Sequence, residues 1–132
     1  MAVLAVDDQA AFRGAVREVV EATEGFELVG EASSCEEALA LVREHDPDLV
    51  LVDVRMPGID GLETTRRLSA AHPGTTFVLV STDELDPPCD ACGAAAFLPK
   101  QAFGQVALRR LWADHGHDAS SPPGDAAPRI GS

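Results

Sequence analysis

The chain has few basic residues and only one lysine, Lys100. Ten lysines and arginines stand against 22 aspartates and glutamates in 132 residues, which gives a formal net charge of −12. Direct, non-specific binding to nucleic acid needs a basic surface that displaces counterions. We therefore expect no direct nucleic-acid binding by this chain alone. The acidic surplus suits a protein that gathers a divalent cation, although it also serves simply to keep a protein in solution.

Long apolar runs and cysteines are scarce as well. The apolar runs "DLVLVDV" and "TFVLVS" are too short to cross a bilayer. The first residues lack the basic region, apolar core and cleavage site of a secretory signal. Three cysteines are too few, and odd in number, for a disulfide framework. We expect a cytoplasmic protein without a membrane partner, in which the thiols are free.

What the chain does contain is five short apolar runs that alternate with segments of helical periodicity. Ser34 and Glu37, for example, form the pattern of a capping box at a helix start. The alternation predicts an α/β fold, a doubly wound parallel sheet of five strands with helices on both faces. The predicted strands are residues 3–6, 26–32, 48–54, 76–81 and 95–99, and the predicted helices are residues 9–22, 34–44, 62–71 and 102–112. In the last helix we expect Phe103, Leu111 and either Val106 or Ala107 to be buried.

The reactive side chains stand at the carboxyl ends of the predicted strands. In an open α/β sheet the ligand site lies outside those ends. The residues there are Asp7 and Asp8 after the first strand, Asp53 after the third, Ser81 after the fourth and Lys100 after the fifth. These side chains are therefore expected to converge on one rim of the sheet.

The rim has the composition of a phosphate-handling metal site. Three carboxylates held close together repel one another, and they either raise their pKa or hold a cation. A set of oxygen ligands suits a hard ion, of which Mg²⁺ is the commonest in cells. A carboxylate in such a site can act as a nucleophile toward a phosphoryl donor. Asp53, which ends the central strand, is the best presented of the three.

The segments "VDDQAAFR", "DLVLVDVRMPGIDGLE", "VLVST" and "AAFLPK" resemble the receiver domain of two-component response regulators, in the variant usually joined to a helix-turn-helix output domain. The resemblance covers about residues 2–112. It implies a flavodoxin-like receiver fold with the strand order 2-1-3-4-5. We expect a receiver domain over residues 1–112, followed over residues 113–132 by a disordered tail or linker stub without apolar periodicity.

The resemblance also implies roles for the rim residues. Asp53 matches the phosphorylated aspartate, and Asp8 and Asp53 match the Mg²⁺ ligands. Asp7 would assist directly or through water, and the backbone carbonyl of Arg55 would complete the protein ligands. The residues that respond to the phosphate would be Ser81 as the switch hydroxyl, Lys100 as the partner of the phosphoryl group and Phe97 as the aromatic that turns inward.

The implied function is a signalling switch and not an enzyme, beyond Mg²⁺-dependent self-phosphorylation and self-dephosphorylation. The phosphoryl group would come from a histidine kinase or another phosphodonor. Phosphorylation would shift a two-state equilibrium toward the active form. A homodimer or a downstream protein would read the change.

The crossover from the fourth to the fifth strand departs from the family pattern. Only residues 82–93 join the two strands, and Pro87 with Pro88 forbids a helix through that point. We predict that the fourth crossover helix is short or absent. Cys89 and Cys92 in this segment could form a redox pair or half of a zinc site. We favour the interpretation that Cys89 and Cys92 are two small residues that pack a shortened loop.

Two other functions remain open from the sequence. A pseudo-receiver would use the remodelled residues 82–93 to bind a partner or ligand independently of phosphorylation. A dehalogenase-type phosphatase would require Asp-x-Asp after the first strand, where this chain has Asp7 followed by Asp8. Whether Asp53 gains a phosphoryl group distinguishes the pseudo-receiver from a phosphorylated receiver.

Overall fold

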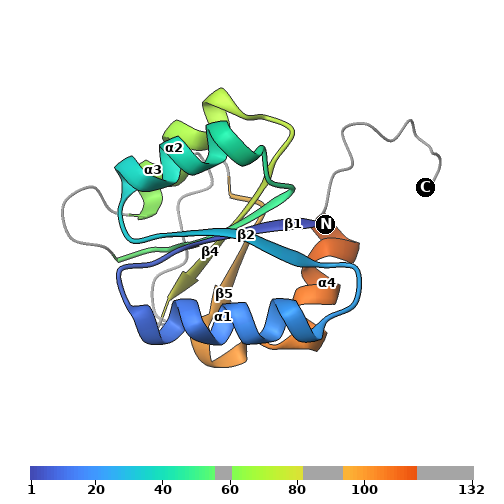
Figure 1. Cartoon of the computed structure of the whole chain (residues 1–132). Coiled ribbons are helices and arrows are strands. Elements are labelled where there is room, and N and C mark those ends of the chain that lie inside the picture. Colours follow the sequence, from blue (N-terminus) through green and yellow to red (C-terminus); the bar gives the residue numbers. More distant parts are fainter. Residues whose placement is uncertain (56–60, 82–93, 116–132) are drawn as a thin grey trace.

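The computed structural model describes residues 1–55, 61–81 and 94–115. Its centre is a parallel sheet of five strands in the order β2-β1-β3-β4-β5 (Figure 1). The strands are β1 (Ala2–Val6), β2 (Glu27–Ala32), β3 (Leu49–Asp53), β4 (Thr76–Ser81) and β5 (Ala96–Pro99). The α/β architecture and the strand order predicted from the sequence are thereby confirmed.

Helices cover both faces of this sheet. Figure 1 shows α1 and α4 on one side and α2 and α3 on the other. Their bounds are α1 (Ala10–Ala22), α2 (Cys35–His45), α3 (Gly61–Ala71) and α4 (Gln105–His115), with a short 3₁₀ turn, η2 (Lys100–Ala102), before α4. None of the helices in the described ranges is long and apolar enough to cross a membrane.

Several predictions fall on residues outside the described ranges. These are the short or absent fourth crossover helix, the thiol pair Cys89 and Cys92, and the tail beyond His115. The division of the chain at residue 112 stays a prediction, although α4 itself continues to His115.

The core consists of two apolar clusters, one on each face of the sheet. Alternate residues of a strand point to opposite faces, so in β1 Leu4 packs with the α2 and α3 side while Val3 packs with the α1 and α4 side. Every residue of β3 and β4 is buried. This burial on both faces explains why the sequences of these strands are almost continuously apolar.

The last helix begins three residues later than predicted. Residues 100–102 form the separate turn η2, and the helix begins only at Gln105. As a result Leu108 and Leu111, three residues apart, face the sheet and are buried, while Val106 is 70% exposed. Of the residues predicted to face inward, Leu111 is buried, and Phe103 and Ala107 are half-buried, whereas Val106, the alternative to Ala107, is exposed.

The helix start predicted at Ser34 is confirmed, but one of the two capping-box hydrogen bonds goes to a different residue. Ser34 Oγ accepts a hydrogen bond from the Glu37 backbone N–H at 3.2 Å. The Glu37 carboxylate accepts from the backbone N–H of Ser33 at 2.6 Å, one residue earlier than a regular capping box. The Ser33 hydroxyl also donates to the Glu37 carboxylate, and this bond, followed by the one from the Ser33 N–H, holds the pKa of Glu37 below its ordinary value.

Candidate functional site

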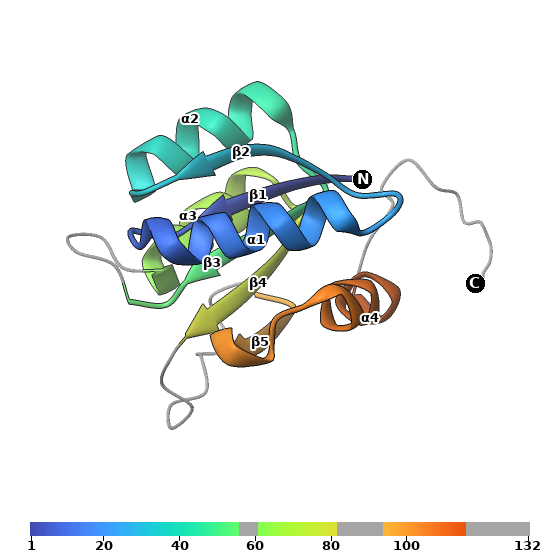
Figure 2. The ribbon, with the colours of Figure 1, turned by 60° about the horizontal axis from the view of Figure 1, so that its bottom comes forward.

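Strand register brings the predicted site residues to one rim of the sheet. Val6 of β1 pairs with Val52 of β3, so the next residues, Asp7 and Asp53, leave neighbouring strands at the same level. Ser81 of β4 pairs with Pro99 of β5, directly before Lys100. In Figure 2 the strands run side by side, which places their carboxyl ends at a common edge. The predicted convergence is confirmed as geometry.

Three carboxylates form an acidic cluster at this rim. One oxygen each of Asp7, Asp8 and Asp53 lies within 4.8 Å of the other two. Asp7 and Asp53 are buried, with 1% and 4% of their surface exposed, whereas Asp8 is exposed. The cluster thus combines two buried carboxylates with one that faces solvent.

The cluster disfavours the charged form of Asp53. The pKa of Asp53 is raised from 3.8 to about 6, chiefly by burial and secondly by the neighbouring Asp7 carboxylate. The Arg55 backbone N–H, which donates to Asp53 Oδ1 at 3.2 Å, and the Lys100 ammonium act in the opposite direction. A cation at this position would remove the cost of keeping the carboxylates ionised together.

The backbone around Asp53 is fixed by close packing. Val54 N–H donates to Val80 O at 2.9 Å, and Gly61 N–H donates to Val54 O at 2.9 Å. A Cβ atom on Gly61 would lie only 1.8 Å from the backbone oxygen of Asp53. Only glycine allows the start of α3 to approach this closely. Gly61 was not among the predicted site residues, although the "DG" before a helical pattern was a usable signal for it.

Lys100 joins the two sides of the rim. Its Nζ atom lies 2.6 Å from Asp7 Oδ2 and 3.5 Å from Asp53 Oδ2, and the Lys100 side chain is 8% exposed. Gln9 Oε1 accepts a hydrogen bond from the same Nζ atom at 3.0 Å. The Phe12 ring centroid is 4.8 Å away.

Sequence reasoning missed two of these four neighbours. Neither Gln9 nor Phe12 is among the site residues that the sequence predicts. Both follow the first strand closely, which was the signal available for them.

The residues present fit a divalent cation. Asp7 Oδ2 is buried and has no hydrogen-bond partner, although it forms an ion pair with Lys100 Nζ at 2.6 Å. An oxygen-only set that includes such an atom matches the preference of Mg²⁺. Within the described ranges, these three aspartates are the only group of acidic, histidine or cysteine side chains arranged in this way.

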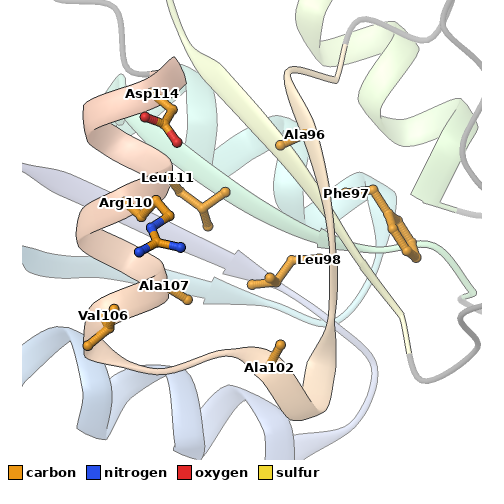
Figure 3. Close-up of a pocket in the computed structure, with 9 residues that line it drawn as sticks. All are labelled: Ala96, Phe97, Leu98, Ala102, Val106, Ala107, Arg110, Leu111 and Asp114. Atoms are coloured by element: carbon orange, nitrogen blue, oxygen red, sulfur yellow. The ribbon is translucent and has the colours of Figure 1, made fainter.

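The predicted switch residues lie on β4 and β5. Ser81 is buried at the end of β4, with 3% of its surface exposed. Phe97 packs against the apolar cluster on the α2 and α3 side. Figure 3 shows its ring on the side of β5 opposite to Leu98 and α4. The structure therefore positions Phe97 near the sheet face without testing its movement.

A mainly apolar pocket of about 450 Å³ lies between β5 and α4 (Figure 3). Leu98, Ala107 and Leu111 are among its lining residues, and Arg110 and Asp114 are its charged members. None of the rim carboxylates lines it. The pocket is therefore separate from the acidic cluster.

Comparisons with known proteins agree with this geometry. The family model described as "Response regulator receiver domain" matches residues 3–110. The response regulator GacA of Pseudomonas viridiflava is 44% identical over 103 residues, which are 76% of this chain and 48% of the relative. The response regulator UvrY of Escherichia coli K12 is 35% identical over 124 residues, which are 89% of this chain and 57% of the relative. The chain thus spans about half the length of these curated relatives.

Solved structures give the same result for the fold. The signal receiver domain of the response regulator NarL from Mycobacterium tuberculosis has a TM-score of 0.73 and 32% identity, and the match covers 86% of this chain and 93% of that one. A CheX–CheY complex with BeF₃ and Mg²⁺ from Borrelia burgdorferi has a TM-score of 0.77 at 24% identity, over 86% and 88% of the two chains. With a family match over most of its length, this chain belongs to the response regulator receiver domain family, as the sequence resemblance indicated.

Proposed function

We propose that the chain takes a phosphoryl group onto Asp53 with the help of Mg²⁺ and thereby acts as a switch in a two-component pathway. Membership of the receiver family establishes a signalling domain and not a conventional enzyme. The observation that carries the proposal is the convergence of Asp7, Asp8 and Asp53 with Lys100 on one rim.

The transfer is a substitution at phosphorus. An oxygen of the Asp53 carboxylate forms the new P–O bond, and the P–N bond of a phosphohistidine on a histidine kinase breaks. The electron pair of that bond leaves with the imidazole nitrogen. The reaction needs Asp53 in its ionised form, because a protonated carboxyl is a poor nucleophile. Its pKa of about 6 leaves it ionised at neutral pH even without a cation.

Mg²⁺ bound at Asp7, Asp8 and Asp53 would balance the charge of the phosphoryl oxygens and of the carboxylates. Lys100, 3.5 Å from Asp53 Oδ2, is placed to pair with a phosphoryl oxygen. Besides these carboxylates we assign the Arg55 backbone carbonyl as a further protein ligand, as the family resemblance implies; Arg55 lies beside the site, where its N–H donates to Asp53 Oδ1. Ser81, buried at the adjoining strand end, would donate its hydroxyl hydrogen to the phosphoryl group.

The output would follow from a shift between two conformations. The new contacts of Ser81 and Lys100 stabilise one conformation, and Phe97 turns inward as they form. A homodimer or a downstream protein would read the result in the cytoplasm. Because the chain spans about half of its relatives' length, the whole protein's output is part of this proposal.

The test is phosphorylation by a small donor. The chain is incubated with Mg²⁺ and acetyl phosphate, and intact-mass spectrometry measures the addition of one phosphoryl group. We expect the addition in the wild type and its loss in Asp53→Asn. Asp46→Asn is the matched control, because Asp46 is exposed at the end of α2 with a φ of 46°, a conformation that asparagine tolerates.

Two outcomes would contradict the proposal. Retention of the phosphoryl group in Asp53→Asn would place the acceptor elsewhere. Failure of the folded wild type to gain it with saturating donor would favour the pseudo-receiver, an interaction module that works without phosphorylation. The addition should also disappear when EDTA removes the divalent cations.

A further inference from the structure

Gln9 occupies a position at which its residue type is unexpected. It is the N-cap of α1, where serine, threonine, aspartate and asparagine are preferred because their side chains accept hydrogen bonds from the first helical N–H groups. The Gln9 side chain makes no such bond. It accepts a hydrogen bond from Lys100 Nζ, 91 positions away in the chain, at 3.0 Å. A residue that breaks a local rule to contact a site is a candidate for a role in that site.

The backbone of Gln9 is held on both sides. Its N–H donates to Asp7 Oδ1 at 2.8 Å, and its carbonyl oxygen accepts from Arg13 N–H at 3.2 Å. The side chain therefore starts from a fixed point between the acidic cluster and the first turn of α1. Through its backbone and its side chain, Gln9 connects Asp7 to Lys100.

Phe12 borders the same ammonium group. Its ring centroid is 4.8 Å from Lys100 Nζ, within the range of a cation–π contact. The ring is itself fixed edge-to-face against Phe103, with the centroids 6.0 Å apart and an interplanar angle of 62°. The ammonium thus has Asp7, Gln9 and Phe12 as close neighbours, and Asp53 as a more distant one.

The distances indicate how the ammonium is shared. A lysine has three N–H donors. Asp7 Oδ2 at 2.6 Å and Gln9 Oε1 at 3.0 Å are close to Nζ, whereas Asp53 Oδ2 at 3.5 Å is beyond a normal hydrogen bond. A donor therefore remains available for a group attached to Asp53, which would fill that gap.

We propose that Gln9 is a positioning residue for Lys100, which holds the ammonium beside Asp7 so that it is ready to pair with a phosphoryl group on Asp53. The part of this inference that concerns the reaction rests on the proposed phosphorylation of Asp53. The hold itself exists in the unphosphorylated chain, so it can be measured without a phosphodonor.

The first experiment uses the fact that Lys100 is the only lysine. Labelling with ¹⁵N-lysine gives a single side-chain ammonium signal in NMR, and its hydrogen exchange with water reports how firmly the group is held. Gln9→Met keeps an unbranched side chain of similar length and removes the oxygen acceptor. We expect exchange to become about three- to tenfold faster in this variant, the loss of roughly one hydrogen bond.

Two further variants sharpen this measurement. Gln9→Glu retains an oxygen acceptor within reach and should keep exchange slow. Gln105→Met is the matched control, because Gln105 is an exposed glutamine at the start of α4, and it should leave the signal unchanged. Equal exchange rates in the wild type and Gln9→Met would overturn the proposed hold on Lys100.

The second experiment is a double-mutant cycle on the rate of phosphorylation by acetyl phosphate. We expect Gln9→Met to lower the rate constant about three- to tenfold and Lys100→Met to lower it more. The double variant should react at the rate of Lys100→Met, because Gln9 acts only through the lysine. An equal effect of Gln9→Met in the absence of Lys100 would overturn the proposed role, as would no effect in its presence.

The two experiments separate this inference from the proposed function. If the wild type gains no phosphoryl group, the proposed function fails, and the exchange measurement alone decides whether Gln9 holds Lys100. If the wild type is phosphorylated and exchange stays slow in Gln9→Met, the inference fails while the function stands. Thermal unfolding of each variant establishes that the chain is folded.

Discussion

The rim of the sheet has two unlike halves. The acidic half consists of Asp7, Asp8 and Asp53, which follow β1 and end β3, strands that lie inside the sheet with neighbours on both sides. The lysine half consists of Phe97 and Lys100, which belong to the edge strand β5 and the turn after it. Every residue of β3 is buried, whereas every residue of β5 is only half-buried.

This difference in burial indicates that the aspartates are held more rigidly than Phe97 and Lys100. The aspartates are held by strands that pack on both faces and pair on both edges, so displacing them would disrupt the core. Residues on an edge strand have fewer neighbours, and their displacement costs less free energy. If Asp53 is phosphorylated as proposed, the acidic half should keep its geometry and the lysine half should be the part that adjusts.

The largest expected loss of stability comes from a substitution that disturbs the backbone next to Asp53. In Gly61→Ala the new Cβ would meet the Asp53 carbonyl oxygen at 1.8 Å, so α3 or the end of β3 must move. We expect the free energy of unfolding to fall by about 3 kcal/mol or more, measured by urea denaturation. Gly14→Ala is the control, because nothing lies within 4 Å of its added Cβ, and it should be neutral or stabilising. Equal stability of the two variants would contradict this packing.

Removing the charge of the lysine half should be the next largest effect. Lys100→Met leaves the buried Asp7 and Asp53 carboxylates without their cation. We expect a loss of about 2–3 kcal/mol of unfolding free energy in the absence of Mg²⁺, since one partner of a buried ion pair remains. Arg109→Met removes an exposed positive charge from α4 and should change stability little. A small loss in both variants would show that Lys100 balances no buried charge.

Removing a charge from the acidic half should have the opposite sign. Asp53 has its pKa raised from 3.8 to about 6 in the folded chain, chiefly by burial, so the folded state binds its proton more tightly than the unfolded state. Its ionisation therefore costs stability as pH rises from about 4 to about 6, and the full cost remains at higher pH. We expect Asp53→Asn to stabilise the metal-free chain by roughly 1–3 kcal/mol near pH 8.

This gain should shrink as the pH falls from about 6 and vanish below about 4, where the wild-type carboxyl becomes protonated in both states. Thermal unfolding of the wild type and of Asp53→Asn in EDTA across this range measures the difference. A gain that grows on acidification would have the wrong sign for a raised pKa and would contradict the buried, repelled carboxylate.

Binding of Mg²⁺ should stabilise the acidic half alone. At a free concentration ten times the dissociation constant, a ligand of the folded state adds about 1.4 kcal/mol. We expect a rise in the melting temperature with MgCl₂ that EDTA reverses. Asp8→Asn, at an exposed position, should leave the metal-free stability almost unchanged but reduce this rise. An undiminished rise in Asp8→Asn would exclude Asp8 as a ligand.

The smallest effect is expected in the apolar part of the lysine half. Phe97 is half-buried against the α2 and α3 cluster, so Phe97→Leu should cost only about 0.5–1.5 kcal/mol. Val106→Ala, at a side chain that is 70% exposed, should cost less still. Chemical denaturation compares the two variants. A loss at Phe97 as large as that of a core residue would mean that β5 is as fixed as β3.

Much of the acidic half could be predicted from the sequence for a definite reason. The apolar run before Asp53 identifies a central strand, and parallel strands deliver their carboxyl ends to one rim whatever the lengths of the crossovers. The cluster of Asp7, Asp8 and Asp53 therefore follows from strand ends alone. The family resemblance added the roles of these residues, which the proposed experiments test.

The surroundings of Lys100 could not be predicted in the same way. The Gln9 contact joins residues 91 positions apart, and no periodicity connects them. The start of α4 was predicted too early and the burial of Leu108 was missed for a related reason, because the turn η2 over Lys100–Ala102 precedes the helix.

The sequence by itself determined the fold class, the order of elements and the rim on which the charged groups meet, because hydrophobic periodicity and strand ends are local properties. Only the tertiary structure decided that Lys100 lies nearer to Asp7 than to Asp53 and that Gln9 and Phe12 border it. The same holds for the close approach of Gly61 to Asp53. These features depend on distances between side chains of different elements, which packing sets and the sequence pattern leaves open.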